Sequence, residues 1–196
     1  SHLLFLGDWD GGNGLTRKMD HLACFFSGVL ALGAYTNPHG GIESERSQRD
    51  LLISRALAYT CREMYHRTAS GIAPEYVRFP AGGGGRGEGL DLVPGPNADF
   101  YILRPETAES LFILAQLTGE QIYRDWAWEI WESIDGVLRT KFGYATLSHV
   151  NDRNSLEDRM ESFFLAETMK YLYLAQHPEK KIDLTLWVFN TESHPM

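Results

Sequence analysis

The sequence has few cysteines, few basic residues and no long apolar run, and each shortage argues against a class of protein. Cys24 and Cys61 are the only cysteines and have no paired histidines nearby, so a zinc site is not expected. No stretch approaches the roughly 20 consecutive apolar residues of a membrane span, and the start does not read as a secretory signal. Lys and Arg number 18 against 26 Asp and Glu, and this net charge of −8 disfavours nucleic acid as a partner.

The length and the two cysteines leave some questions open. A chain of 196 residues with 43% apolar residues fits a single domain, residues 1–196, with a real core. Two cysteines can be two buried thiols, which composition makes the commoner case, or one disulfide in an oxidising compartment. The residues alone do not decide between these.

Apolar residues recur at helical spacing, which predicts helical hairpins joined by Gly- and Pro-rich loops that carry short β segments. The expected helices run from Lys18 to about Tyr35, from about Ser44 to Ala69, from Arg104 to about Thr118, from Glu120 to about Arg139 and from about Leu156 to Gln176. Strands are expected over residues 3–9, 142–150 and 186–189. No repeat consensus of an α-solenoid is present, so the pattern favours a closed α/α toroid.

Two glycine-rich segments are set aside as sites. Residues 81–89 lack the Gly-Lys-Ser/Thr sequence of a phosphate loop and are expected to form a flexible loop. The segment from Asp8 faintly resembles a calcium loop, but Asn13 and Met19 stand where an EF-hand needs glycine and glutamate. Neither segment is therefore counted as a binding site.

The last predicted helix carries a carboxylate among apolar side chains. Glu167 lies within the stripe formed by Phe163, Phe164 and Tyr171, and the opposite side is also apolar, so the helix is expected to be buried. A carboxylate in such surroundings is costly unless it is paired, hydrogen-bonded or near a metal. An arginine from a neighbouring helix is the simpler explanation.

Other polar residues give weaker signals when each is taken alone. Glu106 and Glu109 are three residues apart and share a helix face, and Arg104 just before them could keep one carboxylate ionised. An acidic residue at a helix start is also ordinary helix chemistry. His21 beside an apolar run is more often structural than catalytic. Thr191 could offer a hydroxyl and a carbonyl oxygen, the hard donors that Ca²⁺ prefers.

Five segments together resemble the class I α-mannosidases, glycoside hydrolase family 47, in the same order. They are Lys18–Phe25 (KMDHLACF), Pro74-Glu75, Leu103–Ser110 (LRPETAES), Met160–Thr168 (MESFFLAET) and Phe189–Pro195 (FNTESHP). The resemblance spans nearly the whole chain, from about residue 4 to residue 196.

The resemblance implies a fold and an activity. The fold is all-α with short β hairpins, the C-terminal portion of an (α/α)7 barrel, and the activity is inverting, Ca²⁺-dependent hydrolysis of α-1,2-linked mannose in high-mannose N-glycans. By the same resemblance Glu106 is the catalytic base, Thr191 binds Ca²⁺, and Cys24 and Cys61 form a disulfide. The implied residues that line the sugar pocket or hold the waters of the ion are His21, Glu75, Arg78, Arg104, Glu109, Phe163, Glu167 and Glu192.

The resemblance also raises expectations about what this chain does not contain. The family domain is more than twice as long, so the general acid is expected on an N-terminal half of the same barrel, in a cleaved partner chain or in sequence outside this one. The 196 residues would then form an open arc with exposed apolar edges. The implied disulfide points to the lumen of the secretory pathway, endoplasmic reticulum or Golgi, or to secretion.

The subclass and two other functions stay open. Arg78 resembles the Golgi-type members, whereas residues 143–147 and 157–162 resemble the degradation-enhancing branch. One alternative function is a mannosidase-like lectin or degradation factor that binds glycans with little turnover. The other is a non-enzymatic helical scaffold, against which the intact set of pocket residues argues.

Overall fold

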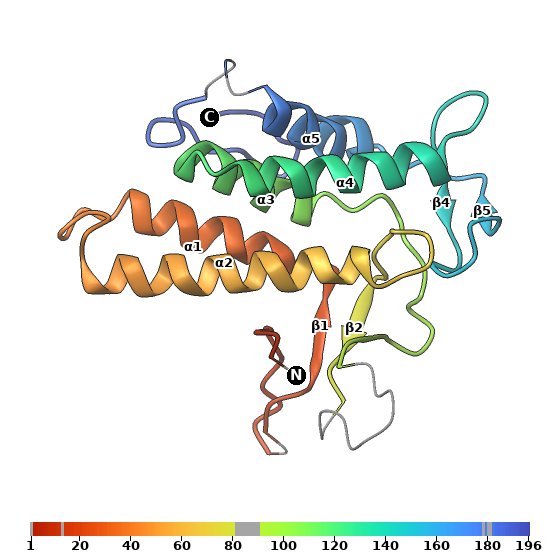
Figure 1. Ribbon diagram of the computed structural model, residues 1–196, viewed down its shortest axis with the longest axis horizontal. Coiled ribbons are helices and arrows are strands. Elements are labelled where there is room, and N and C mark those ends of the chain that lie inside the picture. Colours follow the sequence, from red (N-terminus) through yellow and green to blue (C-terminus); the bar gives the residue numbers. More distant parts are fainter. Residues whose placement is uncertain (1, 13, 81–90, 178, 180–181) are drawn as a thin grey trace.

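A computed structural model describes residues 2–12, 14–80, 91–177, 179 and 182–196. Its helices are α1 (Phe25–Tyr35), α2 (Glu45–His66), α3 (Glu106–Thr118), α4 (Gln121–Leu138) and α5 (Met169–Gln176). Helices α1 and α2 form one hairpin, α3 and α4 form a second that lies over it, and α5 packs beside that second hairpin (Figure 1). Helix α3 contacts all four of the others and therefore occupies the centre of the fold.

The burial of α3 explains this central position. The side chains of Leu111, Phe112 and Leu114 are fully buried, and polar residues on this helix are small enough to bond across to α1. Ser110 Oγ accepts a hydrogen bond from the Gly28 amide (2.8 Å). A Cβ atom at Gly28 would lie 2.9 Å from Ile113 Cδ1, so glycine is what lets α1 approach α3 this closely.

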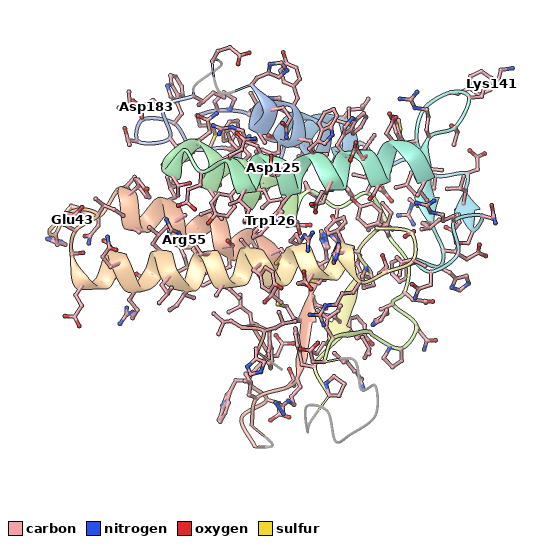
Figure 2. The ribbon with its side chains drawn as sticks, viewed as in Figure 1. Glu43, Arg55, Asp125, Trp126, Lys141 and Asp183 are labelled. Atoms are coloured by element: carbon pink, nitrogen blue, oxygen red, sulfur yellow. A yellow bond between two sulfur atoms is a disulfide. The ribbon has the colours of Figure 1, made fainter. Side chains whose placement is uncertain are left out.

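Helices α2 and α4 are bridged by paired side chains. Arg55 forms an ion pair with Glu120 at the start of α4, and the ring of Tyr59 lies 6.1 Å from that of Trp126. Figure 2 shows Arg55 and Trp126 between the two helices. These contacts link α2 to α4, and Trp126 also packs against the buried core.

Two small antiparallel sheets hold the loops between the helices. The first has the order β1 (Lys18–Asp20), β2 (Tyr76–Arg78) and β3 (Val93–Pro94), and the second pairs β4 (Thr146–Leu147) with β5 (Leu156–Glu157). In the first sheet Met19 pairs with Val77, and both side chains are buried. Strand β1 leads directly into the 3-10 helix η1 (His21–Cys24), so the sheet determines where His21 begins the helical region.

Several sequence-based element predictions are correct and others are wrong. The predictions for α2, α3 and α4 hold to within about three residues at each end. The helix predicted from Lys18 instead begins with β1 and η1, because Lys18–Asp20 pairs with β2 as a strand. Residues 3–9 form no strand apart from a single bridge between Trp9 and Leu15, since no second strand lies alongside. The glycine-rich segment 81–89 lies outside the described residues.

The largest error concerns the C-terminal third. The helix predicted from Leu156 does not start there, because Leu156–Glu157 pairs with Thr146–Leu147 as a strand. Only Thr146–Leu147 of the strand predicted over residues 142–150 is a strand. A π-helix, η2 (Phe164–Thr168), then leads into α5. The strand predicted over 186–189 is reduced to one bridge between Phe189 and Pro195.

Candidate active site

Glu106 is the first residue of α3, and the side chains of His21 and Arg104 lie beside it. His21 Nδ1 is 3.1 Å from Glu106 Oε2, although the two residues are 85 positions apart in the sequence, and Arg104 Nη1 is 3.5 Å from Oε1. Burial by itself raises the pKa of Glu106, but His21 and Arg104 outweigh it and hold the pKa below its ordinary value. Glu106 is therefore a carboxylate at neutral pH, ready to accept a proton.

Arg104 is itself held by Glu75. Its Nε lies 3.1 Å from both carboxylate oxygens of Glu75, and Nη2 approaches Oε1 still more closely. Glu75 also accepts a backbone hydrogen bond from His21 N (2.8 Å) at its carbonyl oxygen. The guanidinium is thus fixed by a two-pronged ion pair and cannot follow Glu106 if that side chain moves.

Strained backbone precedes Arg104. Leu103 has a φ of 68°, in the left-handed region that a bulky residue rarely adopts, and a cost of about 1 kcal/mol or more is expected. Its side chain is fully buried, and its carbonyl oxygen accepts a 2.6 Å hydrogen bond from Thr168 Oγ1 of η2. Packing from both sides therefore maintains the turn that presents Arg104 and Glu106.

Glu109 and Glu167 form a second acidic group that lacks such cations. Burial, reinforced by the charges of Glu106 and Glu167, raises the pKa of Glu109 to about 7, although the Tyr171 hydroxyl donates to it at 3.4 Å. Burial, with the charges of Glu106 and Glu192, likewise raises the pKa of Glu167 to about 7. The local excess of negative charge favours either a proton or a bound cation here.

The C-terminal segment is fastened over α3 and α5. The Phe189 ring packs at 5.8 Å from Phe112 and 5.6 Å from Tyr171, and Lys170 Nζ donates to the Ser193 carbonyl (2.7 Å). Asn190 Oδ1 accepts hydrogen bonds from backbone amides that follow it, which closes the turn containing Thr191. These contacts bring Thr191 to the same opening as the two acidic groups.

A pocket of about 350 Å³ joins these elements. It is lined by six of the predicted site residues, Arg104, Glu106, Glu109, Phe163, Glu167 and Thr191. Six further lining residues were not singled out as site residues from the sequence: Leu22, Phe25, Pro105, Tyr171, Phe189 and Asn190. The position of Tyr171 four residues after Glu167 could have predicted its place, because residues i and i+4 share a helix face.

The remaining predicted residues lie around this pocket or away from it. His21 and Glu75 do not line it but hold Glu106 and Arg104, and Glu192 contributes charge near Glu167. Arg78 is exposed on β2 opposite Lys18 and is not part of the lining. The roles assigned to all of these residues stay predictions.

The prediction that the helix around Glu167 is buried on all sides is wrong. Leu165 is 59% exposed and Tyr173 is 45% exposed, and Glu167 is only partly buried. The π-helix turns Phe164 and Thr168 into the core, and Leu165 faces outward as a result. Glu167 thus borders an open pocket and is not sealed in the interior.

The donors around the pocket are suited to a hard cation, though side chains of this chain do not form a complete cluster. Within the residues that the structure describes, no three His, Cys, Asp or Glu side chains converge as a metal-binding group. The lining nevertheless offers carboxylate and hydroxyl oxygens and no sulfur or imidazole ligand, which is the donor set typical of Ca²⁺. The unbalanced charge of Glu109 and Glu167 fits a cation nearby.

The whole chain, residues 1–196, matches the family model described as glycosyl hydrolase family 47. The chain belongs to this family. It is 43% identical over 185 residues to mannosyl-oligosaccharide 1,2-alpha-mannosidase MNS1 of Arabidopsis thaliana, covering 94% of this chain and 30% of that protein. It is 39% identical over 196 residues to mannosyl-oligosaccharide alpha-1,2-mannosidase IA of Spodoptera frugiperda, covering 100% of this chain and 28% of that protein.

A solved structure agrees with the sequence comparison. The alpha-1,2-mannosidase from Trichoderma reesei superposes with a TM-score of 0.82 at 31% identity, covering 98% of this chain and 41% of that one. The predicted family and the fold class, an all-α portion of an (α/α)7 barrel with short β hairpins, are thereby confirmed. The chain spans about 30% of the length of the curated relatives it matches.

The disulfide implied by the family is also present. Cys24 at the end of η1 is bonded to Cys61 of α2, with their Cα atoms 5.9 Å apart. The bond joins the segment that carries His21 to the helix that carries Tyr65, so it helps fix the surroundings of Glu106.

Proposed function

We propose that this chain forms the base-bearing side of the active site of an inverting, Ca²⁺-dependent α-1,2-mannosidase that trims high-mannose N-glycans. The observation that carries this proposal is the ionised Glu106, fixed by His21 and Arg104 at the edge of an acidic pocket with aromatic walls. The names of the relatives support the substrate class, because those proteins are mannosyl-oligosaccharide 1,2-mannosidases.

Glu106 acts as the general base in this proposal. An inverting glycosidase activates a water molecule on one face of the sugar while an acid protonates the leaving oxygen on the other face, with the two carboxyl groups roughly 6.5–9.5 Å apart. Glu106 has a depressed pKa and accepts the proton of that water as the water attacks the anomeric carbon. Arg104 stabilises the carboxylate before the transfer and keeps it in place.

The pocket walls position the sugar. Phe163 offers an apolar face against which a pyranose ring can stack, while Glu167 and Glu109 accept hydrogen bonds from hydroxyls or from ordered waters. Thr191 would hold Ca²⁺ through its hydroxyl and carbonyl oxygens, with Glu109, Glu167 and Glu192 holding the waters of the ion. When bound, the ion supplies positive charge and coordination for mannose hydroxyls.

The general acid belongs, in this proposal, to sequence beyond these 196 residues, in the N-terminal half of the same barrel. Support comes from the chain's share of its relatives, about 30% of their length. An exposed apolar stripe, formed by Leu22 and Phe25 of the pocket lining and by Val29 next to them on α1, offers a surface for that half.

We assign the protein to the lumen of the secretory pathway, endoplasmic reticulum or Golgi, or to secretion. The Cys24–Cys61 disulfide supports this assignment, because disulfides persist in oxidising compartments. Within the described ranges, none of the helices has both the length and the apolar character required to cross a membrane.

Replacement of Glu106 by Gln tests the proposed function. The natural polypeptide, with any chain that co-purifies with it, is assayed for mannose release from a high-mannose glycan and for glycan binding. Glu106→Gln keeps the shape but cannot accept the proton, so turnover should fall to background while glycan binding stays within about threefold. Glu129→Gln, on α4 and paired with Arg62 outside the pocket, is the matched control. Unchanged turnover in Glu106→Gln removes Glu106 from the mechanism.

A mannosidase-like lectin is distinguished by the same assay. Such a protein would bind the glycan with little turnover in the unmodified form, so that Glu106→Gln would change neither measurement.

A further inference from the structure

Thr191 lies in a short hairpin loop at the edge of the pocket. The Asn190 amide donates to the His194 carbonyl (3.1 Å), and the Ser193 amide donates to the Asn190 carbonyl (2.9 Å), so residues 191–193 form the loop. Thr191 and Glu192 are at its tip, and both are exposed. Hairpin loops of this length usually end on a left-handed residue, which is most readily glycine.

Ser193 occupies this left-handed position. Its φ is 56°, a conformation that is unfavourable for residues other than glycine, and its side chain is completely buried. The Ser193 carbonyl oxygen accepts a 2.7 Å hydrogen bond from Nζ of Lys170, the second residue of α5. The bond fixes the direction of this carbonyl, and with it the orientation of the peptide unit that ends the loop.

Among the described residues, one contact on each side of the tip attaches the loop to the helices. Before the tip, the Phe189 ring packs against Phe112 of α3 and Tyr171 of α5. After the tip, the contact is the hydrogen bond from Lys170. Ring packing alone is not strongly directional, whereas a hydrogen bond from a charged group is both directional and strong. Lys170 therefore determines how the tip with Thr191 is turned toward the pocket.

The charge of Lys170 needs an explanation at this place. Lys170 forms no ion pair with any residue that the structure describes, and Glu167, about one helical turn before it, feels its charge only at longer range. By charge alone, a cation beside the proposed calcium site would repel the ion and weaken its binding. The contact with the Ser193 carbonyl gives Lys170 a purpose that outweighs this repulsion.

We propose that Lys170 is a positioning residue that orients the loop so that Thr191 presents its hydroxyl and carbonyl oxygens to Ca²⁺. This inference rests on the proposed function for the role of Thr191 as a calcium ligand. Lys170 does not line the pocket, and it acts through the Ser193 carbonyl, two residues after Thr191. Without this hydrogen bond the loop would take several orientations, and calcium binding would have to order it.

The calcium affinity of Lys170→Met tests the proposal, because positioning and charge predict opposite changes. The natural polypeptide, with any chain that co-purifies with it, is stripped of metal with EDTA, dialysed and titrated with Ca²⁺ in a calorimeter. Methionine keeps an apolar stem but has no donor, so the Kd for Ca²⁺ should rise about tenfold. If only charge mattered, the Kd would fall. An unchanged or lower Kd overturns the proposal.

Lys141→Met is the matched control. It removes the same charge from a residue outside the pocket lining, and Figure 2 shows Lys141 far from the C-terminal segment that carries Asp183. Its Kd for Ca²⁺ should stay within about twofold of that of the unmodified protein. A tenfold rise in this variant as well would overturn the proposal, because the loss would then not depend on the contact with Ser193.

Hydrogen exchange of the metal-free protein provides a readout that does not depend on calcium. Peptides that cover residues 189–196 should exchange at least about fivefold faster in Lys170→Met, while peptides from α3 should be unchanged, since general destabilisation would raise exchange throughout the fold. In kinetics, the Ca²⁺ concentration for half-maximal turnover should rise about tenfold, and kcat at saturating Ca²⁺ should stay within about twofold. Unchanged exchange over residues 189–196 overturns the proposal.

This inference and the proposed function fail in distinguishable ways. If the unmodified protein binds no Ca²⁺, the calcium assignment in the proposed function is wrong, and this inference falls with it. If the unmodified protein binds Ca²⁺ and Lys170→Met binds it equally tightly, this inference alone falls, and Glu106 and Thr191 keep their proposed roles.

Discussion

The two sides of the pocket differ in how their negative charge is compensated. On one side Glu106 and Glu75 share Arg104, so each carboxylate has a cation within 3.5 Å, and His21 also contacts Glu106. On the other side Glu109 and Glu167 have only the Tyr171 hydroxyl and the more distant Lys170 in their favour, and their pKa values rise to about 7. The paired side has its cation within the chain, whereas the unpaired side carries negative charge that the proposed Ca²⁺ would balance.

In the proposed function the two sides of the pocket serve different purposes, one for the catalytic base and the other for the cation and the sugar. A base needs a fixed, ionised carboxylate before the substrate arrives, and fixed ion pairs provide it. A cation and a neutral sugar instead need oxygen atoms that are not already bonded to arginine or lysine. The comparison therefore predicts that metal removal acts on the unpaired side and that loss of Arg104 acts on the paired side.

Removal of the metal should have the largest effect. Treatment of the purified protein with EDTA should reduce mannose release to background and lower the Tm, because an ion that binds only the folded state stabilises it by about 3 kcal/mol at a hundredfold excess over its Kd. Ca²⁺ should restore both. If chelation changes neither, the assignment of Thr191 as a calcium ligand is wrong.

Substitution of Arg104 should have the next largest effect. Arg104→Gln leaves Glu75 and Glu106 without their shared cation, which should lower the free energy of unfolding by about 3 kcal/mol and turnover by at least about 100-fold. Arg55→Gln breaks the exposed pair with Glu120 and should cost less than about 1 kcal/mol. Urea unfolding of both variants makes the comparison, and equal losses would contradict a special role for the paired side.

Removal of the disulfide should have a smaller effect on stability. It should still disturb the side of the pocket that carries Glu106 and Arg104. Replacing both Cys24 and Cys61 by Ala opens a link between residues 37 positions apart and should cost about 2–3 kcal/mol of unfolding free energy. Because the bond ties η1 to α2, turnover should fall more than calcium affinity does. A loss of calcium affinity with unchanged turnover would contradict this prediction, because it would mean that the disulfide acts on the side of the pocket that carries Glu109 and Glu167.

The pH dependence of stability should show the smallest effect. The pKa of Glu109 is raised from its ordinary value of 4.5 to about 7, so folding favours the protonated form. The stabilisation is complete below pH 4.5 and is lost as the pH rises through about 7, a change on the order of 2 kcal/mol after allowance for partial exposure. Unfolding of the metal-free protein between pH 4.5 and 7.5 measures it. Glu109→Gln should remove the Glu109 contribution, while the more exposed Glu167, whose pKa is also raised to about 7, leaves a smaller slope of the same sign. An unchanged slope in Glu109→Gln assigns it to other groups.

The sequence predicts the parts of this fold that depend on local pattern. Helices α3 and α4 follow from apolar spacing, because their buried faces persist over three or more turns. The strand β5 could not be found this way, since Leu156–Glu157 is a strand only because Thr146–Leu147 lies opposite. Short pairings between loops leave no periodicity of their own.

The site residues divide in the same way, into those that the sequence predicts and those that depend on contacts between distant residues. Glu106 and Thr191 were found through the family's motifs, while physical reasoning alone gave only an acidic residue at a helix start and a polar turn. The sequence does not identify Tyr65, because nothing near it in the chain points to His21, which is 44 residues away. Contacts between distant residues inside the core become visible only in three dimensions.

The π-helix η2 has a consequence for how this chain can vary. Its wider turn accommodates one residue more than a regular helix would, and Glu167 lies within it, between the buried Phe164 and Thr168. Deleting a single residue there would restore ordinary winding and leave four residues to fill the five positions between Phe163 and Met169. Either the carboxylate would leave the pocket or Thr168 would lose the Leu103 carbonyl, so we expect substitutions to be tolerated in this segment far more readily than changes in its length.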